Sequence, residues 1–208
     1  MTLIGINGGT FDPIHYGHLR PALEVQQQLG LQQVLFVPCY QPVHRSQPQA
    51  SAKQRCEMIE SAIQSQPTFA LETIEIDRAG SSYMVETLAA LKQRFKHESS
   101  VLMMGSDAFA TFHTWHDWAG ILTLANIAVM HRPNEPIPIT CESGDIYQTH
   151  QVHKLTKPAG QIVEVAVTQL DISSTLIKEH LKRGDAVDYL LPPPVIKMIE
   201  HHGLYQTI

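Results

Sequence analysis

The residues with the clearest capacity for chemistry form one run near the N-terminus, from Gly8 to His18. Gly8 and Gly9 allow the backbone to approach a ligand closely and to present its N–H groups, and Thr10 adds a hydroxyl. His15 and His18 are three residues apart, a spacing that places both imidazoles on one side of a helix entry. Together these residues have the properties of a site that binds phosphate groups.

A turn between a strand and a helix would hold this run in place. The apolar run Leu3–Asn7 predicts a strand that the glycine pair ends, and helical spacing of apolar residues predicts a helix from about His18 to Leu29. Gly30 stands where a helix C-cap is expected. Because the N-terminus of a helix disfavours imidazolium, we expect at least one of the two histidine rings to be neutral and to donate an N–H.

The rest of the chain continues the alternation of strands and helices. Further strands are expected at 34–37, 69–76, 101–104, 127–130 and 162–167, and further helices at 51–65, 82–95, 173–183 and 195–202, the first three capped by Ser51, Ser82 and Ser173. Residues 38–50 are predicted to form a long loop, and residues 132–161 show no clear period. This order predicts an α/β Rossmann-like fold, a doubly wound parallel sheet in three layers (α/β/α), as a single domain over residues 1–208. Ligands bind such sheets at the carboxyl ends of the strands.

Composition and charge exclude several classes of function. The chain has 208 residues, 43% of them hydrophobic, and a net charge of −5, which argues against general electrostatic binding of nucleic acid or membrane. No apolar run of about 18 residues predicts a membrane span, and the N-terminus has no basic region typical of a secretory signal. Cys39, Cys56 and Cys141 lack CxxC spacing and are expected to be free thiols in a reducing compartment, so we expect a cytoplasmic protein. The sequence leaves the choice between monomer and homo-oligomer open.

Two short motifs resemble signatures of the HxGH nucleotidyltransferase superfamily. Residues 15–18 read His-Tyr-Gly-His, and residues 172–178 read Ile-Ser-Ser-Thr-Leu-Ile-Lys, with Lys178 where the superfamily usually has arginine. The resemblance implies transfer of a nucleotidyl group from a nucleoside triphosphate with release of pyrophosphate. Hydroxyl groups at a helix N-terminus suit the binding of a triphosphate, and lysine keeps the charge of arginine but not its bidentate fork.

Further motifs in the same order are similar to those of the bacterial nicotinate-nucleotide adenylyltransferases. They are Gly8–Pro13, Pro42–Arg45, Ser82–Tyr83, Gly105–Asp107, Thr114–Trp115, Arg132–Pro133 and Leu190–Val195. The likeness covers essentially the whole chain. It implies transfer of the adenylyl group of ATP to nicotinate mononucleotide, which gives nicotinate adenine dinucleotide and pyrophosphate in NAD biosynthesis.

The resemblance also assigns residues to the two substrates. The ATP-binding residues are expected to be Gly8, Gly9, Thr10, Phe11, His15, His18, Gly105, Ser106, Asp107, Ile172, Ser173, Ser174, Thr175 and Lys178. The residues that bind nicotinate mononucleotide are expected to be His44, Arg45, Ser82, Tyr83, Met84, Trp115, His116 and Arg132. Among them, His44 and Arg45 would meet the acceptor phosphate and Trp115 would stack on the pyridine ring. Met84 and His116 depart from the family pattern, which often has threonine and an aromatic residue there.

The implied reaction needs no general base. A phosphate monoester has a second pKa of about 6 and is already largely dianionic at neutral pH, so positioning and charge neutralisation suffice. We expect His18 on the α-phosphate, His15 at the β/γ end and Lys178 beside the leaving pyrophosphate, with residues 173–208 completing the ATP site. Mg²⁺ is expected to arrive with ATP and no resident metal site is predicted, although Asp12 is a candidate on the metal side.

Other functions remain open at this point. A sister adenylyltransferase that prefers nicotinamide mononucleotide or pantetheine phosphate is the nearest alternative, and a non-catalytic nucleotide-binding protein is the alternative of a different class. A metal hydrolase could use the spaced pairs His113/His116 or His150/His153, but neither has an HExxH or CxxC partner. The Walker motif and the GxSxG elbow are both absent.

Overall fold

The computed structural model describes residues 1–42, 47–131, 142–168 and 170–206. The expectations for His44, Arg45, Arg132 and Cys141 lie outside the described residues. Within the described residues, no helix combines the length and the apolar composition that crossing a membrane requires.

Six parallel strands form one sheet within the described residues, in the order β3-β2-β1-β4-β5-β6. The strands are β1 Thr2–Gly9, β2 Gln33–Pro38, β3 Phe69–Leu71, β4 Glu98–Gly105, β5 Ala125–His131 and β6 Ile162–Ala166. The order runs backward from β3 to β1 and then forward from β4 to β6, so the switch point lies between β1 and β4. Ligands bind Rossmann-like sheets at this point, beyond the carboxyl ends of the strands.

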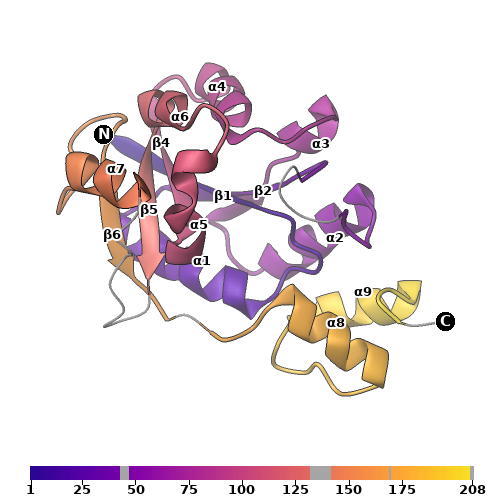
Figure 1. The fold of residues 1–208 in the computed structure, drawn as a ribbon. Coiled ribbons are helices and arrows are strands. Elements are labelled where there is room, and N and C mark those ends of the chain that lie inside the picture. Colours follow the sequence, from indigo (N-terminus) through magenta and orange to yellow (C-terminus); the bar gives the residue numbers. More distant parts are fainter. Residues whose placement is uncertain (43–46, 132–141, 169, 207–208) are drawn as a thin grey trace.

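Helices cover both faces of this sheet (Figure 1). They are α1 Tyr16–Leu29, α2 Ala52–Ile63, α3 Ile74–Arg78, α4 Met84–Arg94, α5 Ser106–Ala110, the 3₁₀ helix η1 Phe112–Thr114, α6 Trp118–Leu124, α7 Glu142–His150, α8 Ser174–Arg183 and α9 Pro193–His202. One buried cluster joins the sheet to α1, α2, α8 and α9, and the other joins it to α4, α5, α6 and α7. The predicted three-layer fold is therefore confirmed.

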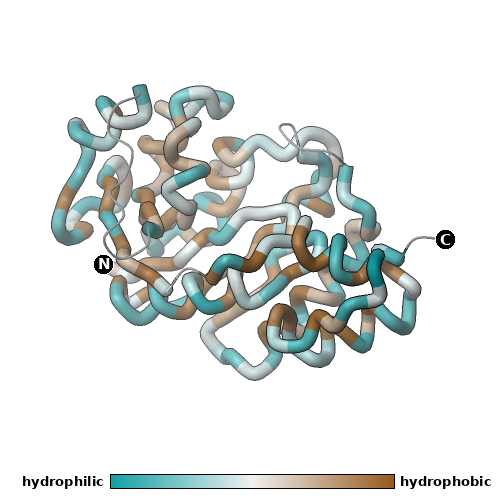
Figure 2. The backbone as a smooth tube through the Cα atoms, turned by 60° about the horizontal axis from the view of Figure 1, so that its bottom comes forward, coloured by the Kyte–Doolittle hydropathy of each residue, from teal (hydrophilic) through white to brown (hydrophobic). Residues whose placement is uncertain are grey.

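Alternate residues of the central strands supply these two clusters. In β2, Val34 and Phe36 belong to the first cluster, whereas Leu35 and Val37 belong to the second. This is the pattern of a strand buried on both faces, and it explains why the strands read as continuous apolar runs. In Figure 2 hydrophobic positions gather in the interior, where strands and helices meet.

Two expectations about the segment after β2 are wrong. The predicted strand 69–76 ends at Leu71, and α3 begins at Ile74, because the buried Glu72 carboxylate accepts from the Ile74 N–H at 3.2 Å and pairs with Arg94 at 2.7 Å. Ser82 does not cap the following helix, whose N-cap is Tyr83. Its hydroxyl instead accepts a hydrogen bond from the Tyr40 N–H at 3.0 Å.

The segment from 132 to 161, which showed no period in the sequence, contains the helix α7. Its buried face includes Ser143 and Gly144 beside Ile146 and Tyr147, so small and polar residues interrupt the apolar periodicity. The short helices α5 and α6 were also not anticipated, since five and seven residues give too few turns for a pattern.

Candidate active site

The turn between β1 and α1 brings the two histidines of the first motif together. His15 is the N-cap of α1 and has extended backbone angles, φ −149° and ψ 172°. The ring of His18 stacks on that of His15 with centroids 3.7 Å apart. Both imidazoles therefore lie at the N-terminus of a 14-residue helix, beside the switch point of the sheet, where anions are favoured.

His15 is buried, with 4% of its surface exposed. Burial lowers the pKa of its ring to about 4, so the imidazole is neutral at pH 7. The sequence anticipated a neutral ring from the position at the helix end, and burial favours the same neutral form. Among the described residues its Nδ1 has no hydrogen-bond partner, an unusual state for a buried polar atom.

The hydrogen bonding of His18 indicates its tautomer. Its Nδ1 accepts from the backbone N–H of His15 at 3.3 Å, three residues earlier in the chain. A neutral ring that accepts at Nδ1 carries its proton on Nε2. His18 is thereby prepared to donate an N–H from the outer nitrogen of the ring.

Phe11 packs on the inner side of this turn. It has a φ of 50°, in the left-handed region, and only 1% of its surface is exposed. Its ring lies edge-on to that of His18, with centroids 5.1 Å apart. A Cβ at Gly9 would lie 3.0 Å from the Phe11 Cζ, so glycine at this position leaves room for the ring.

The second motif lies directly against the first. A Cβ at Gly17 would be 2.9 Å from the carbonyl oxygen of Ile172 and 2.9 Å from the ring of His15, a distance real Cβ atoms essentially never show. Ser174 Oγ also donates to the Pro13 carbonyl at 3.0 Å. Glycine at position 17 therefore allows segments some 155 residues apart to meet at one site.

The hydroxyl groups of the second motif have different surroundings. Ser173 is the N-cap of α8 and accepts from the Leu176 N–H at 3.1 Å, which confirms the predicted cap. Ser174 is half-buried and bound to the turn, whereas Thr175 is exposed.

Lys178 is paired with Asp12. Its Nζ donates to Asp12 Oδ2, and 20% of the Lys178 side chain remains exposed. Both carboxylate oxygens of Asp12 already accept hydrogen bonds from protein donors. Since these bonds occupy the lone pairs that a cation would need, the arrangement does not fit Asp12 as a metal ligand.

Of the residues expected to bind the acceptor, the structure describes Ser82, Tyr83, Met84, Trp115 and His116. The rings of Tyr83 and His116 are 4.5 Å apart, and Trp115 packs on Phe112 with centroids 5.9 Å apart. Met84, the first residue of α4, lies so close to β1 that a Cβ at Gly8 would be 2.7 Å from its terminal methyl carbon. His116 thus gives Tyr83 a flat aromatic partner, although it departs from the family pattern.

The remaining ATP-side residues follow the strand next to β1. Gly105 ends β4, and Ser106 and Asp107 form the first turn of α5. Because β4 is paired in parallel with β1, these residues emerge at the same edge of the sheet as the histidine turn. The Asp107 carboxylate is exposed and folds back toward Gly105.

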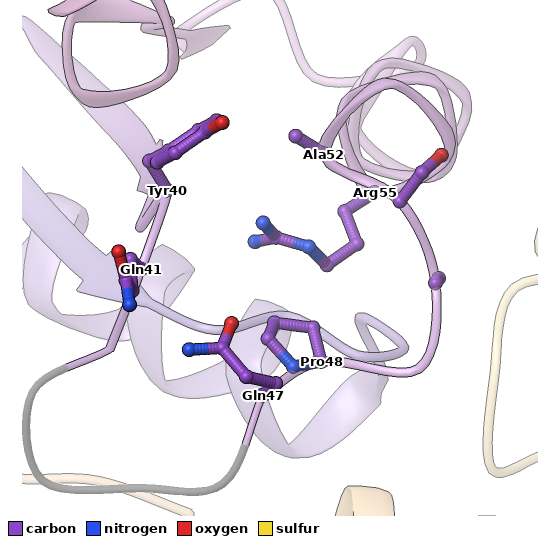
Figure 3. A pocket seen from close by; sticks show the side chains of 8 residues that line it. Tyr40, Gln41, Gln47, Pro48, Ala52 and Arg55 are labelled. Carbon is purple, nitrogen blue, oxygen red and sulfur yellow. The ribbon is translucent and has the colours of Figure 1, made fainter. Parts of the chain in front are cut away.

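Arg55 is a further residue beside the turn that no motif in the sequence singled out. Its side chain is 1% exposed and lines a cavity of about 360 Å³ that also contacts Tyr40, Gln41 and Gln47 (Figure 3). One guanidinium nitrogen, Nη1, donates to the Thr10 carbonyl at 2.8 Å. This hydrogen bond fixes the backbone of the turn between β1 and α1. A signal was present in the sequence, since Met58 and Ile59 follow at helical spacing and share the buried face of α2.

The two histidine pairs considered for a metal hydrolase have other contacts. His113 Nδ1 lies 2.8 Å from Ser143 Oγ, and His150 Nδ1 lies 2.9 Å from the Gly160 carbonyl oxygen. Within the described ranges, no group of three or more His, Cys, Asp or Glu side chains is arranged to hold a metal ion.

Comparisons with known proteins identify the family of the chain. The family model for cytidylyltransferase-like proteins matches residues 6–180. A protein of Hydrogenovibrio crunogenus named as a probable nicotinate-nucleotide adenylyltransferase is 59% identical over 204 residues, which are 98% of either chain. One of the same name from Methylococcus capsulatus is 42% identical and covers 98% of this chain and 99% of its own.

Solved structures show the same fold. The nicotinic acid mononucleotide adenylyltransferase of Plasmodium falciparum complexed with NaAD superposes with a TM-score of 0.76 at 17% identity, covering 99% of this chain and 98% of its own. On the motifs, the fold and the full-length identity to these relatives, the chain belongs to the nicotinate-nucleotide adenylyltransferases, within the cytidylyltransferase-like family.

Proposed function

We propose that the protein transfers the adenylyl group of ATP to nicotinate mononucleotide, with release of pyrophosphate, in NAD biosynthesis. The observation that supports this most directly is the histidine turn at the switch point of the sheet, where two stacked imidazoles meet the start of the second motif. The full-length relatives carry the name of this activity.

The reaction is a direct displacement at the α-phosphorus. An oxygen of the acceptor phosphate forms the new P–O bond, and the bond between the α-phosphorus and the bridging oxygen to the β-phosphate breaks. No proton has to be removed from the dianionic nucleophile. The protein therefore acts by aligning the two phosphates and by stabilising charge on the transferring and leaving groups.

The histidine turn supplies these interactions on the ATP side. His18 donates its Nε2–H to the α-phosphate, and the neutral His15 lies toward the β/γ end. Lys178, paired with Asp12 but partly exposed, donates to the leaving pyrophosphate through its ammonium group. Mg²⁺ enters with ATP as part of the substrate and keeps mainly water and phosphate ligands.

The acceptor binds across the end of β1, among Ser82, Tyr83, Met84, Trp115 and His116. His44, Arg45 and Arg132 remain our candidates for contacts with the acceptor phosphate. The protein is one domain over residues 1–208, and residues 173–208 complete the ATP site through Ser174 and Lys178.

Pyrophosphate release tests this function. The purified protein is incubated with ATP, Mg²⁺ and one acceptor at a time: nicotinate mononucleotide, nicotinamide mononucleotide or pantetheine phosphate. We expect the highest kcat/KM with nicotinate mononucleotide. A preference for one of the other two acceptors would identify a sister enzyme, and ATP binding with no pyrophosphate from any acceptor would indicate the non-catalytic alternative.

We expect Trp115→Ala to raise the KM for nicotinate mononucleotide by about tenfold, because stacking of a flat ring on an aromatic side chain contributes about 1–2 kcal/mol. The KM for ATP should change little. Trp118→Ala is the matched control, since Trp118 also packs on Phe112, with centroids 6.2 Å apart, but lies outside the motif. An equal rise in both KM values would contradict the placement of the acceptor.

A further inference from the structure

The carboxylate of Asp12 joins four separate segments of the chain. Oδ2 accepts from the Gln49 N–H at 2.9 Å and from Lys178 Nζ. Oδ1 accepts from the Ala50 N–H at 3.0 Å and from the Tyr205 hydroxyl at 2.7 Å. Asp12 is 4% exposed, so all its hydrogen bonding within the described structure is with protein donors.

Tyr205 reaches Asp12 through an uncommon backbone conformation. Gly203 ends α9 with a φ of 57°, and Tyr205 has a φ of 64°, which is unfavourable for a residue with a side chain. The chain turns back in this way and buries the tyrosine to 7% exposure. Its ring also lies under Lys178, with Nζ 5.1 Å from the ring centroid.

The protonation states of this group are well defined. Burial raises the pKa of Asp12, but hydrogen bonds from Lys178, Tyr205 and two backbone N–H groups outweigh it, so the pKa lies below its ordinary value. Burial, together with the charge of Asp12, raises the pKa of Tyr205 above its ordinary value. At neutral pH the carboxylate is therefore charged, and the phenol remains a hydrogen-bond donor.

We propose that Tyr205 is a positioning residue for adenylyl transfer, which acts through Asp12 to let Lys178 move from the carboxylate to the leaving pyrophosphate. This inference rests on the proposed function. If Lys178 turns toward the pyrophosphate, Asp12 keeps three neutral donors, two backbone N–H groups and the Tyr205 hydroxyl. The buried charge then stays hydrogen-bonded while the ammonium is away.

Without the Tyr205 hydroxyl, the buried carboxylate of Asp12 would have one hydrogen bond fewer, and Lys178 would contribute a larger share of its stabilisation. The carboxylate would hold the ammonium more tightly, and less of its charge would be available to the leaving group. The weaker interaction between Lys178 and the leaving group should lower kcat and leave the KM for ATP nearly unchanged, because this interaction is strongest in the transition state.

Other contacts hold the C-terminal part on the turn when the hydroxyl is removed. Ser174 Oγ donates to the Pro13 carbonyl at 3.0 Å, and the Tyr16 N–H donates to the Leu190 carbonyl at 3.1 Å. The last helix, α9, packs against α2, as Figure 1 also shows. Tyr205→Phe also keeps the ring and its contact with Lys178, so this variant should fold.

The test is a double-mutant cycle of Tyr205→Phe and Lys178→Met, assayed by pyrophosphate release from ATP and nicotinate mononucleotide. We expect Tyr205→Phe to lower kcat about tenfold in the wild-type background, with the KM for ATP changed less than twofold. In the Lys178→Met background the same change should have almost no effect, because the residue through which it acts is gone.

Tyr189→Phe is the matched control, since Tyr189 is 92% exposed and also has a φ of 64°. Thermal unfolding of each variant checks folding, and Tyr205→Met replaces Tyr205→Phe if the latter does not fold. An unchanged kcat in the hydroxyl-free variant, or equal losses in both backgrounds, would overturn the inference. A wild-type protein with no pyrophosphate release would instead contradict the proposed function.

Discussion

His18→Ala is expected to lower kcat by about 10³-fold while the protein stays folded. In the proposed mechanism His18 directs an N–H at the transferring phosphate, and removal of one such donor to a developing charge costs about 2.7–4 kcal/mol of transition-state stabilisation. The measurement is steady-state pyrophosphate release at saturating ATP and nicotinate mononucleotide. The KM values should change far less than kcat, because the interaction strengthens in the transition state.

The fold of this variant is checked separately. His18 Nδ1 accepts from the His15 N–H near the start of α1, and the loss of such an interaction at a helix N-terminus destabilises a protein by about 1 kcal/mol. A small decrease in the unfolding temperature is therefore expected. His97→Ala is the control, since His97 is exposed and precedes β4, at the opposite end of the parallel strands from the turn. Activity within a few-fold of wild type in His18→Ala would remove His18 from the mechanism.

The parts of the fold that were predictable are those with local signals. Ser51 and Gln54 form the capping box that their spacing indicated, with Ser51 Oγ accepting from the Gln54 N–H at 3.3 Å. Gly30 and Gly184 end α1 and α8 in the left-handed conformation. Each of these interactions joins residues within one helical turn, so the sequence carries the whole signal.

The histidine turn was also predictable, because a strand, a glycine pair and a helix start follow one another directly. Its supporting contacts were not. Lys178 and Asp12 are 166 positions apart, and Tyr205 and Asp12 are 193 positions apart. No periodicity or capping rule relates residues at such separations, and only the folded sheet brings them together. The sequence therefore suggested Asp12 as a metal-side group, whereas the structure shows a carboxylate with all its oxygens engaged by protein donors.

This difference changes the physical role of the second motif. From the sequence, Lys178 was a cation directed at the pyrophosphate alone. In the structure it is paired with the buried carboxylate of Asp12 beneath the histidine turn, so under the proposed mechanism the same ammonium group serves both stability and catalysis. Arginine, the usual residue here, would be held by a bidentate fork, whereas the single nitrogen of lysine can move from one anion to the other.

Asp12→Asn is expected to lower the free energy of unfolding by about 3–5 kcal/mol at pH 7, because it leaves the ammonium of Lys178 without a buried anionic partner. The asparagine NH₂ would also replace one of the two carboxylate oxygens and would then face hydrogen-bond donors. At the position of Oδ2 these are the Gln49 N–H and Lys178, and at the position of Oδ1 they are the Ala50 N–H and the Tyr205 hydroxyl. Chemical denaturation of the wild type and the variant at pH 7 measures the difference.

The pH dependence of this difference has a definite sign. The pKa of Asp12 in the folded protein lies below its ordinary value of 3.8, so the charged form stabilises the fold above that value. As the pH falls below 3.8 toward the folded-state pKa, the wild type loses this stabilisation and the variant, which cannot titrate there, does not. The difference in the free energy of unfolding between the wild type and Asp12→Asn should be constant from pH 6 to 8 and should become smaller below pH 4. Asp145→Asn, at an exposed carboxylate on α7, is the control and should change the free energy of unfolding at pH 7 by less than about 1 kcal/mol. A difference for Asp12→Asn below 1 kcal/mol at pH 7, or one that stays constant down to pH 3, would contradict the charge-based account of this cluster.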